Sequence, residues 1–318
     1  MIDGGATFDE AVKLAEAGVD RALSSSPPVI REYTGHLKAS RGKFIRAISL
    51  LSCAENSEGQ ISADAVSFAA AIELLHLATL VHDDVIDDAD KRRGVITLQK
   101  KYGKKNAVIC GDYLLCAALK TASAVSDRKR YLNIDIPDYM SRVCLGELRQ
   151  NINIGNFDLS TYGYMKIILG KTAALFEASF FMGAVICGAN DADLKKYTRL
   201  GRFTGMIFQL TDDCMDYEMP EGGAKKPVRS DYEQGVITLP LIYALENTAG
   251  FKDAVREGKI PKSEVCAALK SSGGLDFTRS VSAKYREKAM RLIDALLLTD
   301  CKRARLLSIL DKAYARKE

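Results

Sequence analysis

The chain has 318 residues, of which 47% are hydrophobic and 27% are charged, and its 45 Lys and Arg residues against 41 Asp and Glu residues give a formal net charge of +4. This profile is typical of a soluble globular protein. So small a net charge on so long a chain gives no reason to expect a nucleic acid as partner, because phosphate backbones are bound by concentrated positive charge. Function must therefore come from local groups of residues.

The N-terminal string MIDGGATFDEAV is acidic and shows no basic region followed by an apolar one, so we expect no secretory signal. The purest apolar run, residues 180–189, is about half of the roughly 20 residues that a membrane span needs. We expect a cytoplasmic protein with at most a peripheral membrane contact. Its cysteines are scattered without a C-x-x-C pair, which predicts buried, reduced thiols; they are Cys53, Cys110, Cys116, Cys144, Cys187, Cys214, Cys266 and Cys301.

Apolar residues recur along the chain with helical rather than alternating spacing, and turn-forming strings such as SSSPP, ENSEGQ and SSGG separate the periodic segments. The predicted helices are Thr7–Leu23, Lys43–Ala54, Asp64–Asp90, Lys105–Ala124, Asp138–Ile154, Thr161–Cys187, Asp191–Glu218, Ile237–Leu245, Ser263–Leu269 and Phe277–Ala315. No low-complexity linker divides them. We expect an all-α fold in a single helical domain covering residues 1–318.

Residues 67–90, SFAAAIELLHLATLVHDDVIDDAD, are apolar around most of the predicted helix. Aligned carboxylates buried there without partners would be unstable, so cations should face them. Mg²⁺ suits two aspartates one turn apart, because it takes one or two protein carboxylates and completes its octahedron with water and phosphate oxygens. At 100° per residue the polar side chains share a sector of about 80°; they are His76, Thr79, Asp83, Asp87 and Asp90.

The pattern recurs in the string QLTDDCMD, residues 209–216, where Gln209, Asp212, Asp213 and Asp216 share a sector of about 100°. One acidic helix end usually faces solvent, but two of the same pattern favour opposing walls of a metal site large enough for a diphosphate. Arginine and lysine side chains that suit phosphate oxygens accompany these clusters; they lie at positions 43, 46, 91–93, 171 and 225–226.

With these motifs the chain resembles the trans-type polyprenyl diphosphate synthases, which are head-to-tail prenyltransferases. The resemblance implies an all-helical bundle of the isoprenoid synthase type with a central cavity. The resemblance runs from about residue 42 to residue 240. The matching elements are Gly42-Lys43 with Arg46, His76 with Asp83–Asp87 and Arg92-Arg93-Gly94, Gly146-Glu147 with Gln150, Lys171-Thr172-Ala173, Gln209 with Asp212–Asp216, Lys226-Pro227, and then Asp231, Gly235, Thr238 and Pro240.

The resemblance implies two to three Mg²⁺ ions that bridge an allylic diphosphate, with ligands Asp83, Asp84, Asp87, Asp212 and Asp216. Arg92, Lys171 and Lys226 would neutralise the departing diphosphate. Thr172 and Gln209 would offer oxygen dipoles to the allylic cation, and together with Lys171 and Lys226 they are the expected catalytic residues. The diphosphate of isopentenyl diphosphate would be held by Gly42, Lys43, Arg46, His76 and Arg93.

In this family the residues one turn before the first aspartate cluster form the floor under the growing chain. Here they are Ala78 and Thr79, both small, which predicts a product longer than geranylgeranyl diphosphate, in the hexa- to octaprenyl range. On a helical wheel Thr79 lies near Asp83, whereas Ala78 is turned about 140° away. The role of Ala78 therefore depends on the resemblance alone.

The chain departs from the family pattern at Arg41, Phe44 and Ala47, none of them an expected phosphate ligand. Val236 stands where many members place a lysine that contacts the allylic diphosphate, and Lys225 or Arg229 could replace it.

Three alternatives stay open. A shorter-chain farnesyl or geranylgeranyl diphosphate synthase would carry the same motifs. A class I terpene cyclase binds no second diphosphate and usually has a different second motif, and a non-catalytic partner subunit tends to lose aspartates that this chain keeps. The family's habit predicts a homodimer, and a heteromer is the alternative.

Overall fold

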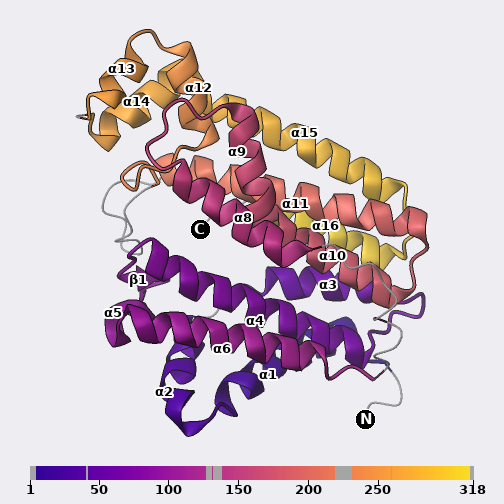
Figure 1. Ribbon diagram of the computed structural model, residues 1–318. Coiled ribbons are helices and arrows are strands. Elements are labelled where there is room, and N and C mark those ends of the chain that lie inside the picture. The colour runs from indigo at the N-terminus through magenta and orange to yellow at the C-terminus, as the bar shows by residue number, and fades with distance from the viewer. Residues whose placement is uncertain are drawn as a thin grey trace.

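Figure 1 shows the computed structural model, which describes residues 5–40, 42–126, 131, 138–218, 231–258 and 260–315. Helices dominate the described chain, so the predicted all-α class is confirmed. The elements of the first half are α1 (Phe8–Ser24), α2 (Pro28–Leu37), the 3₁₀ turn η1 (Lys38–Ser40), α3 (Ile45–Ala54), α4 (Ala63–Ile86), the strands β1 (Lys91–Arg92) and β2 (Val95–Ile96), α5 (Leu98–Tyr102) and α6 (Lys104–Ala122). Those of the second half are α8 (Tyr139–Ile152), α9 (Thr161–Ile168), the π turn η2 (Leu169–Ala173), α10 (Ala174–Cys187), α11 (Asp191–Glu218), α12 (Leu239–Asn247), α13 (Phe251–Arg256), α14 (Lys262–Ser272), α15 (Gly274–Asp294) and α16 (Asp300–Tyr314).

The helices form two groups that α3 connects. In Figure 1, α4 and α6 lie side by side in the lower half, with α1 and α2 below them, and α8 to α11 and α15 fill the upper half. Helix α3 packs against both α4 and α10. Helix α8 packs against the π turn and α10, which brings it over the segment that carries the candidate catalytic residues.

Helix α4 begins where predicted but ends earlier. The Ser62 side chain accepts a hydrogen bond from Ala65 N, as an N-cap does. The helix ends at Ile86, and the left-handed backbone of Asp88 (φ 51°) turns the chain into the β1–β2 hairpin. Asp90 therefore leaves the predicted polar stripe, and its carboxylate pairs with Lys100 at 2.9 Å on the surface.

Other predictions of elements were also incomplete. The predicted helix 161–187 contains the π turn, and the predicted helix 277–315 is two helices separated by residues 295–299. The short helices α2, α5 and α13 were missed, because segments of five to ten residues carry too few periodic positions for recognition.

Helix α10 forms the centre of the core. Phe176 and Phe180 are its largest fully buried side chains. Two segments, Ala63–Ile86 and Thr161–Cys187, are long and apolar enough to cross a membrane by length and composition, and 50% and 83% of their most apolar windows are buried inside the protein. Core helices of a helical protein pass the same test.

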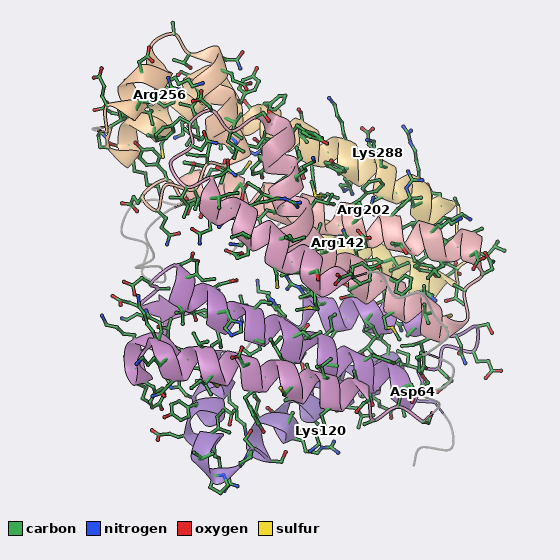
Figure 2. All side chains as sticks on the ribbon, viewed as in Figure 1. Asp64, Lys120, Arg142, Arg202, Arg256 and Lys288 are labelled. Atoms are coloured by element: carbon green, nitrogen blue, oxygen red, sulfur yellow. The ribbon has the colours of Figure 1, made fainter. Side chains whose placement is uncertain are left out.

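The buried Glu177 carboxylate fastens α10 to its neighbours, since Arg142 of α8 donates to both of its oxygens at 2.9 and 3.0 Å. Arg202 of α11 adds a bond at 2.9 Å. Figure 2 shows Arg142 and Arg202 close together in the upper half of the molecule. A buried charge needs such partners, and here they fix the relative positions of three helices that surround the π turn.

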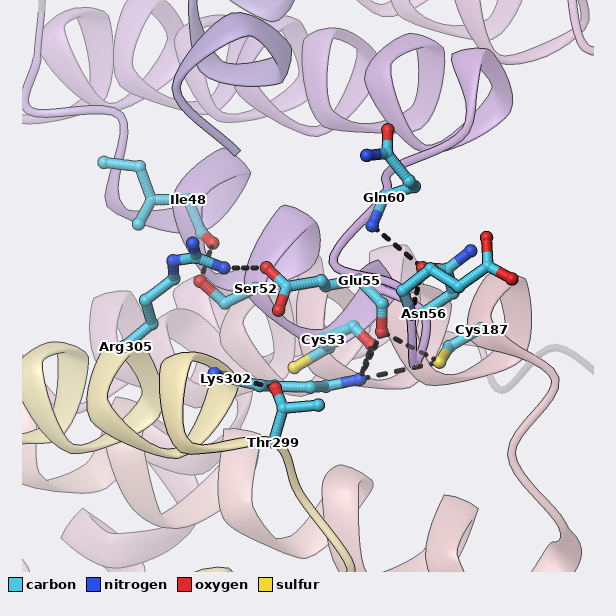
Figure 3. Close-up of polar contacts among 11 residues, drawn as sticks. Ile48, Ser52, Cys53, Glu55, Asn56, Gln60, Cys187, Thr299, Lys302 and Arg305 are labelled. Carbon is cyan, nitrogen blue, oxygen red and sulfur yellow. Dashed lines mark hydrogen bonds and ion pairs between the residues drawn. The ribbon is translucent and has the colours of Figure 1, made fainter. Parts of the chain in front are cut away.

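Lys302 fastens the C-terminal helix α16 to the end of α3 (Figure 3). Its ammonium donates to Cys53 O at 2.7 Å and to Glu55 O at 2.8 Å, carbonyls that α3 leaves without helical partners. Its Nζ also lies 3.5 Å from Cys187 Sγ. Arg305 forms an ion pair with the Glu55 carboxylate one turn further along α16.

All eight cysteines are free thiols, as predicted. The expectation that they are buried holds for Cys53, Cys110 and Cys214 only. It is wrong for the exposed Cys116, Cys144 and Cys301, because the apolar sequence around the first two forms solvent-facing stripes on α6 and α8.

Candidate active site

The π turn η2 lies at the centre of the candidate site. π-Helical turns are rare and occur often at functional sites. Two glycines let α8 run directly against it: a Cβ on Gly146 would lie 2.1 Å from Lys171 N, and one on Gly170 would lie 2.6 Å from Arg142 O. These two positions therefore require glycine, because the backbones are already in contact.

Lys171 connects the π turn to α8 and α4. Its Nζ lies 3.0 Å from Glu147 Oε1 and 2.9 Å from Oε2. Burial alone would lower the pKa of Lys171, but Glu147, Asp83 and Asp87 raise it above its ordinary value. Lys171 is thus a charged group held among carboxylates from two helices. Sequence reasoning included Glu147 in a motif but gave it no role.

The aspartates of the first motif lie in two different environments. Burial raises the pKa of Asp83 to about 7, with Glu147 and Asp87 adding to the shift and Lys171 opposing it. Burial also raises the pKa of Asp87. Asp84 is 6% exposed and accepts from Arg92 Nε at 2.7 Å. In this structure Asp84 and Arg92 are therefore engaged with each other, while Asp83 and Asp87 share the surroundings of Lys171.

The π turn reaches the second motif through Thr172. Its hydroxyl donates to Gln209 Oε1 at 2.6 Å, and Gln209 Nε2 donates to Asp213 Oδ1 at 2.8 Å. Adjacent residues of one turn thus face different motifs, Lys171 the first and Thr172 the second. Tyr164, which sequence reasoning missed, donates from its buried hydroxyl to Asp213 Oδ2.

The other residues of the second motif, Asp212 and Asp216, are half-buried. Asp216 Oδ2 accepts from the backbone N–H of Asp231 at 3.1 Å, which ties this later residue to the motif. Lys226, Lys225 and Arg229 lie outside the described residues, so their expected roles stay predictions.

A cationic group lies beside α4. Arg46 is 7% exposed, and its guanidinium carbon lies 4.8 Å from the centre of the Phe176 ring. Burial lowers the pKa of the half-buried His76 well below its ordinary value, and Arg46, Arg93 and Arg92 lower it further. The structure thus brings these expected diphosphate-binding residues together, with His76 neutral among three arginines.

Glu73 positions this group and was missed in the sequence. It is 8% exposed, and its Oε1 accepts from Ala47 N at 2.9 Å at the start of α3, where Phe44 has left-handed backbone (φ 52°). Burial raises the pKa of Glu73, while Arg46 and Arg93 oppose the shift. A glutamate inside the apolar string AAAIELLH was the available signal, because a buried carboxylate needs partners.

Gly42 and Lys43 precede α3 at this group. A Cβ on Gly42 would lie 2.8 Å from Arg93 Nη1, so the glycine leaves room for the guanidinium. Lys43 is exposed.

The two expected chain-length residues differ in environment. Ala78 is fully buried in the core that includes α4 and α6. Thr79 is half-buried, and its hydroxyl donates to His76 O at 2.8 Å. Both assignments stay predictions.

Within the part of the chain that the structure describes, no three His, Cys, Asp or Glu side chains lie close enough to hold a metal by themselves. Mg²⁺ does not require such a group, since one or two carboxylates together with water and substrate phosphate oxygens complete its octahedron. The oxygen-only donors of the two motifs fit that ion.

An all-helical fold that joins two aspartate motifs through one lysine-bearing turn, beside a group of arginines, defines an isoprenoid-synthase type of protein. A family model described as polyprenyl synthetase matches residues 27–270. The chain therefore belongs to the polyprenyl synthetase family and is a prenyltransferase, which confirms the resemblance found in its motifs.

Individual relatives of the chain are also named as polyprenyl synthases. The chain is 33% identical to heptaprenyl diphosphate synthase component 2 of Geobacillus stearothermophilus over 90% of each protein. Its fold matches a heptaprenyl diphosphate synthase from Staphylococcus aureus with a TM-score of 0.89 and 32% identity, covering 99% of this chain and 100% of that one. It also matches a polyprenyl synthase from Caulobacter crescentus, solved with calcium and isoprenyl diphosphate, with a TM-score of 0.85, 28% identity and full coverage of both chains.

Proposed function

We propose that the protein condenses isopentenyl diphosphate with an allylic diphosphate to form a linear all-trans polyprenyl diphosphate longer than C20. The observation that carries this proposal is the π turn, which presents Lys171 to Asp83 and Asp87 and Thr172 to Gln209. The π turn thereby joins the lysine and aspartates that would bind the charged diphosphate to the neutral oxygen atoms that suit the allylic cation.

Ionisation of the allylic substrate needs positive charge around the departing diphosphate. Asp83, Asp87, Asp212 and Asp216 would hold Mg²⁺, which supplies such charge when bound. Lys171 adds a fixed ammonium. The buried carboxylates, whose pKa values are raised in the protein alone, are groups that bound cations would stabilise.

The second substrate must be oriented so that its double bond meets the allylic carbon. Arg46, Arg93 and the exposed Lys43 would hold its diphosphate, with bidentate arginine contacts fixing its direction. Neutral His76 would add an N–H donor without further positive charge. Thr172 and Gln209 would face the transient cation with oxygen atoms.

The product length is supported by small residues at positions 78 and 79 and by relatives named for heptaprenyl products. We propose a product in the hexa- to octaprenyl range.

We propose that the active form is a homodimer. Exposed apolar side chains form stripes on two helices, Val108, Ile109 and Leu119 on α6 and Leu145, Leu148 and Ile152 on α8. Such stripes favour burial in an interface. A relative named as a component makes a heteromer the alternative, and light scattering on purified protein distinguishes the two.

Free thiols throughout support a cytoplasmic location, which cell fractionation tests.

The decisive assay combines purified protein, Mg²⁺ and labelled isopentenyl diphosphate with dimethylallyl, geranyl, farnesyl or geranylgeranyl diphosphate in turn, and sizes the products by chromatography. We expect chain extension beyond C20 from at least one starter. A cyclic hydrocarbon without extension would contradict the proposal, and products that stop at C15 or C20 would contradict the product length. Activity that appears only with a second protein would indicate a heteromeric synthase.

A further inference from the structure

Four side chains form a continuous hydrogen-bonded series beside the proposed site. Thr172 Oγ1 donates to Gln209 Oε1 at 2.6 Å, Gln209 Nε2 donates to Asp213 Oδ1 at 2.8 Å, and Tyr164 donates to Asp213 Oδ2. Tyr164 and Asp213 are 2% and 1% exposed. The series therefore begins at an expected catalytic hydroxyl and ends in the core.

Asp213, the acceptor at the buried end, determines which atom donates in each hydrogen bond of the series. Both Asp213 oxygens accept in the structure, Oδ2 from the Tyr164 hydroxyl and Oδ1 from Gln209, so the NH₂ group of Gln209 faces Asp213. Its carbonyl oxygen then faces Thr172, and the threonine hydroxyl has to donate its only hydrogen to it. The remaining lone pairs of Thr172 are left for the reacting space.

The reverse direction would present the wrong charge. If the Gln209 amide turned over, its NH₂ group would donate to Thr172 Oγ1 and the hydroxyl hydrogen would be free to point outward. That hydrogen carries partial positive charge, which an allylic cation would repel, and a fixed dipole acts strongly in a water-excluded site. The direction of this amide therefore matters for the reaction.

Tyr164 holds Asp213, the residue that determines the direction of the Gln209 amide. Asp213 lies directly after Asp212 in the second motif, and its carboxylate has two oxygens, one on Gln209 and one on the tyrosine hydroxyl. Helix α9, which carries Tyr164, leads directly into the π turn that carries Thr172. The series thus closes a ring between α9, the π turn and α11.

We propose that Tyr164 and Asp213 are positioning residues that fix the direction of the Gln209 amide, so that oxygen lone pairs of Thr172 face the allylic cation. This role rests on the proposed function of the same site.

The test begins with Tyr164→Phe, which removes the hydroxyl and keeps the ring. The rate of a single condensation at saturating substrates should fall about tenfold or more, with the KM of each diphosphate changed by less than about twofold, because only an interaction of the transition state is weakened. Tyr162→Phe is the matched control, since Tyr162 lies on the same helix and is 69% exposed. It should leave the rate unchanged.

A double-mutant cycle separates positioning from packing. Because Tyr164 acts through Gln209 on Thr172, Tyr164→Phe should cause little further loss in a Thr172→Val background. Fully additive losses would show that Tyr164 acts elsewhere and would overturn the proposal, as would an unchanged rate in the single variant.

Variants at Asp213 give a second route if Tyr164→Phe does not fold. Asp213→Glu keeps two acceptor oxygens and should keep more of the original rate than Asp213→Asn. The asparagine has one acceptor oxygen for two donors and can turn its NH₂ group toward Gln209, so its rate should fall about tenfold or more. Equal rates for these two variants would overturn the proposal. Absence of chain extension by the unmodified protein would contradict the proposed function, and the positioning role with it.

Discussion

Arg93 lies against Gly42, and an alanine Cβ at position 42 would stand 2.8 Å from Nη1 and 3.0 Å from Nη2 of its guanidinium. The two residues come from separate segments, the residues before α3 and the turn of the β1–β2 hairpin. Arg93 reaches this place with left-handed backbone (φ 52°). The glycine therefore sets the position of an arginine that we assign to the second diphosphate.

Gly42→Ala should displace this guanidinium, because the clash involves the flexible end of a side chain rather than backbone. We expect the KM for isopentenyl diphosphate to rise about tenfold, with KM for the allylic substrate unchanged and stability altered by less than about 1 kcal/mol. Steady-state kinetics with each substrate varied in turn measure the split.

Gly35→Ala provides the control for Gly42→Ala, since nothing lies within 4 Å of a Cβ at position 35 in α2. It should leave both KM values unchanged. If Gly42→Ala raised the allylic KM instead, Arg93 would belong to the other diphosphate.

Asp83→Asn should stabilise the metal-free protein above pH 7. The pKa of Asp83 is raised from its ordinary value of 3.8 to about 7, so the folded protein binds more protons than the unfolded chain between these values. The free energy of unfolding therefore falls as the pH rises toward 7, and the loss is complete above it. Asparagine carries no charge and avoids this loss. Thermal unfolding in a chelator should show a clearly larger gain of the variant at pH 8, where the loss is complete, than at pH 5, where only part of it has occurred.

The same substitution should reduce prenyl transfer by about a hundredfold or more, since it removes a proposed metal ligand. Asp88→Asn serves as the control, because that exposed carboxylate forms a surface ion pair with Lys104 of a kind worth about 0–1 kcal/mol. If Asp83→Asn raised the thermal stability equally at pH 5 and pH 8, this result would contradict the raised pKa of Asp83.

The sequence was sufficient to predict which side chains lie together on one helix, because helical spacing alone determines those neighbours. Asp83 and Asp87 are one turn apart, so any helix there places them on one face. Contacts between elements could not be predicted in this way. The bond from Ala47 N in α3 to Glu73 of α4 and the contact of Glu147 with Lys171 depend on how the helices pack, and the π turn departs from the regular period. The end of α4 before Asp90 likewise depends on the left-handed backbone of Asp88, a residue type that helices also accept.

Thr79→Phe should shorten the product by at least one isoprene unit, because Thr79 is half-buried one turn before Asp83. Ala78→Phe should instead cost about 1–3 kcal/mol of stability, since Ala78 is fully buried in the core. Chromatography of the products measures chain length, and Thr79→Ser should leave it unchanged. Shortening by Ala78→Phe alone would place the floor at position 78.

Lys302→Met should destabilise the protein without changing the chemistry of the site. Its ammonium satisfies two carbonyls at the end of α3, and methionine keeps most of the apolar stem but donates no hydrogen bond. Two charged hydrogen bonds are lost and the Cys53 carbonyl loses its donor, while the Glu55 carbonyl keeps a bond from Cys187 Sγ at 3.2 Å. The free energy of unfolding should therefore fall by about 2–3 kcal/mol in urea titrations. Lys312→Met, at an exposed position of the same helix, should change it by less than about 0.5 kcal/mol. Equal effects of the two substitutions would show that the contacts of Lys302 contribute nothing beyond those of a surface lysine.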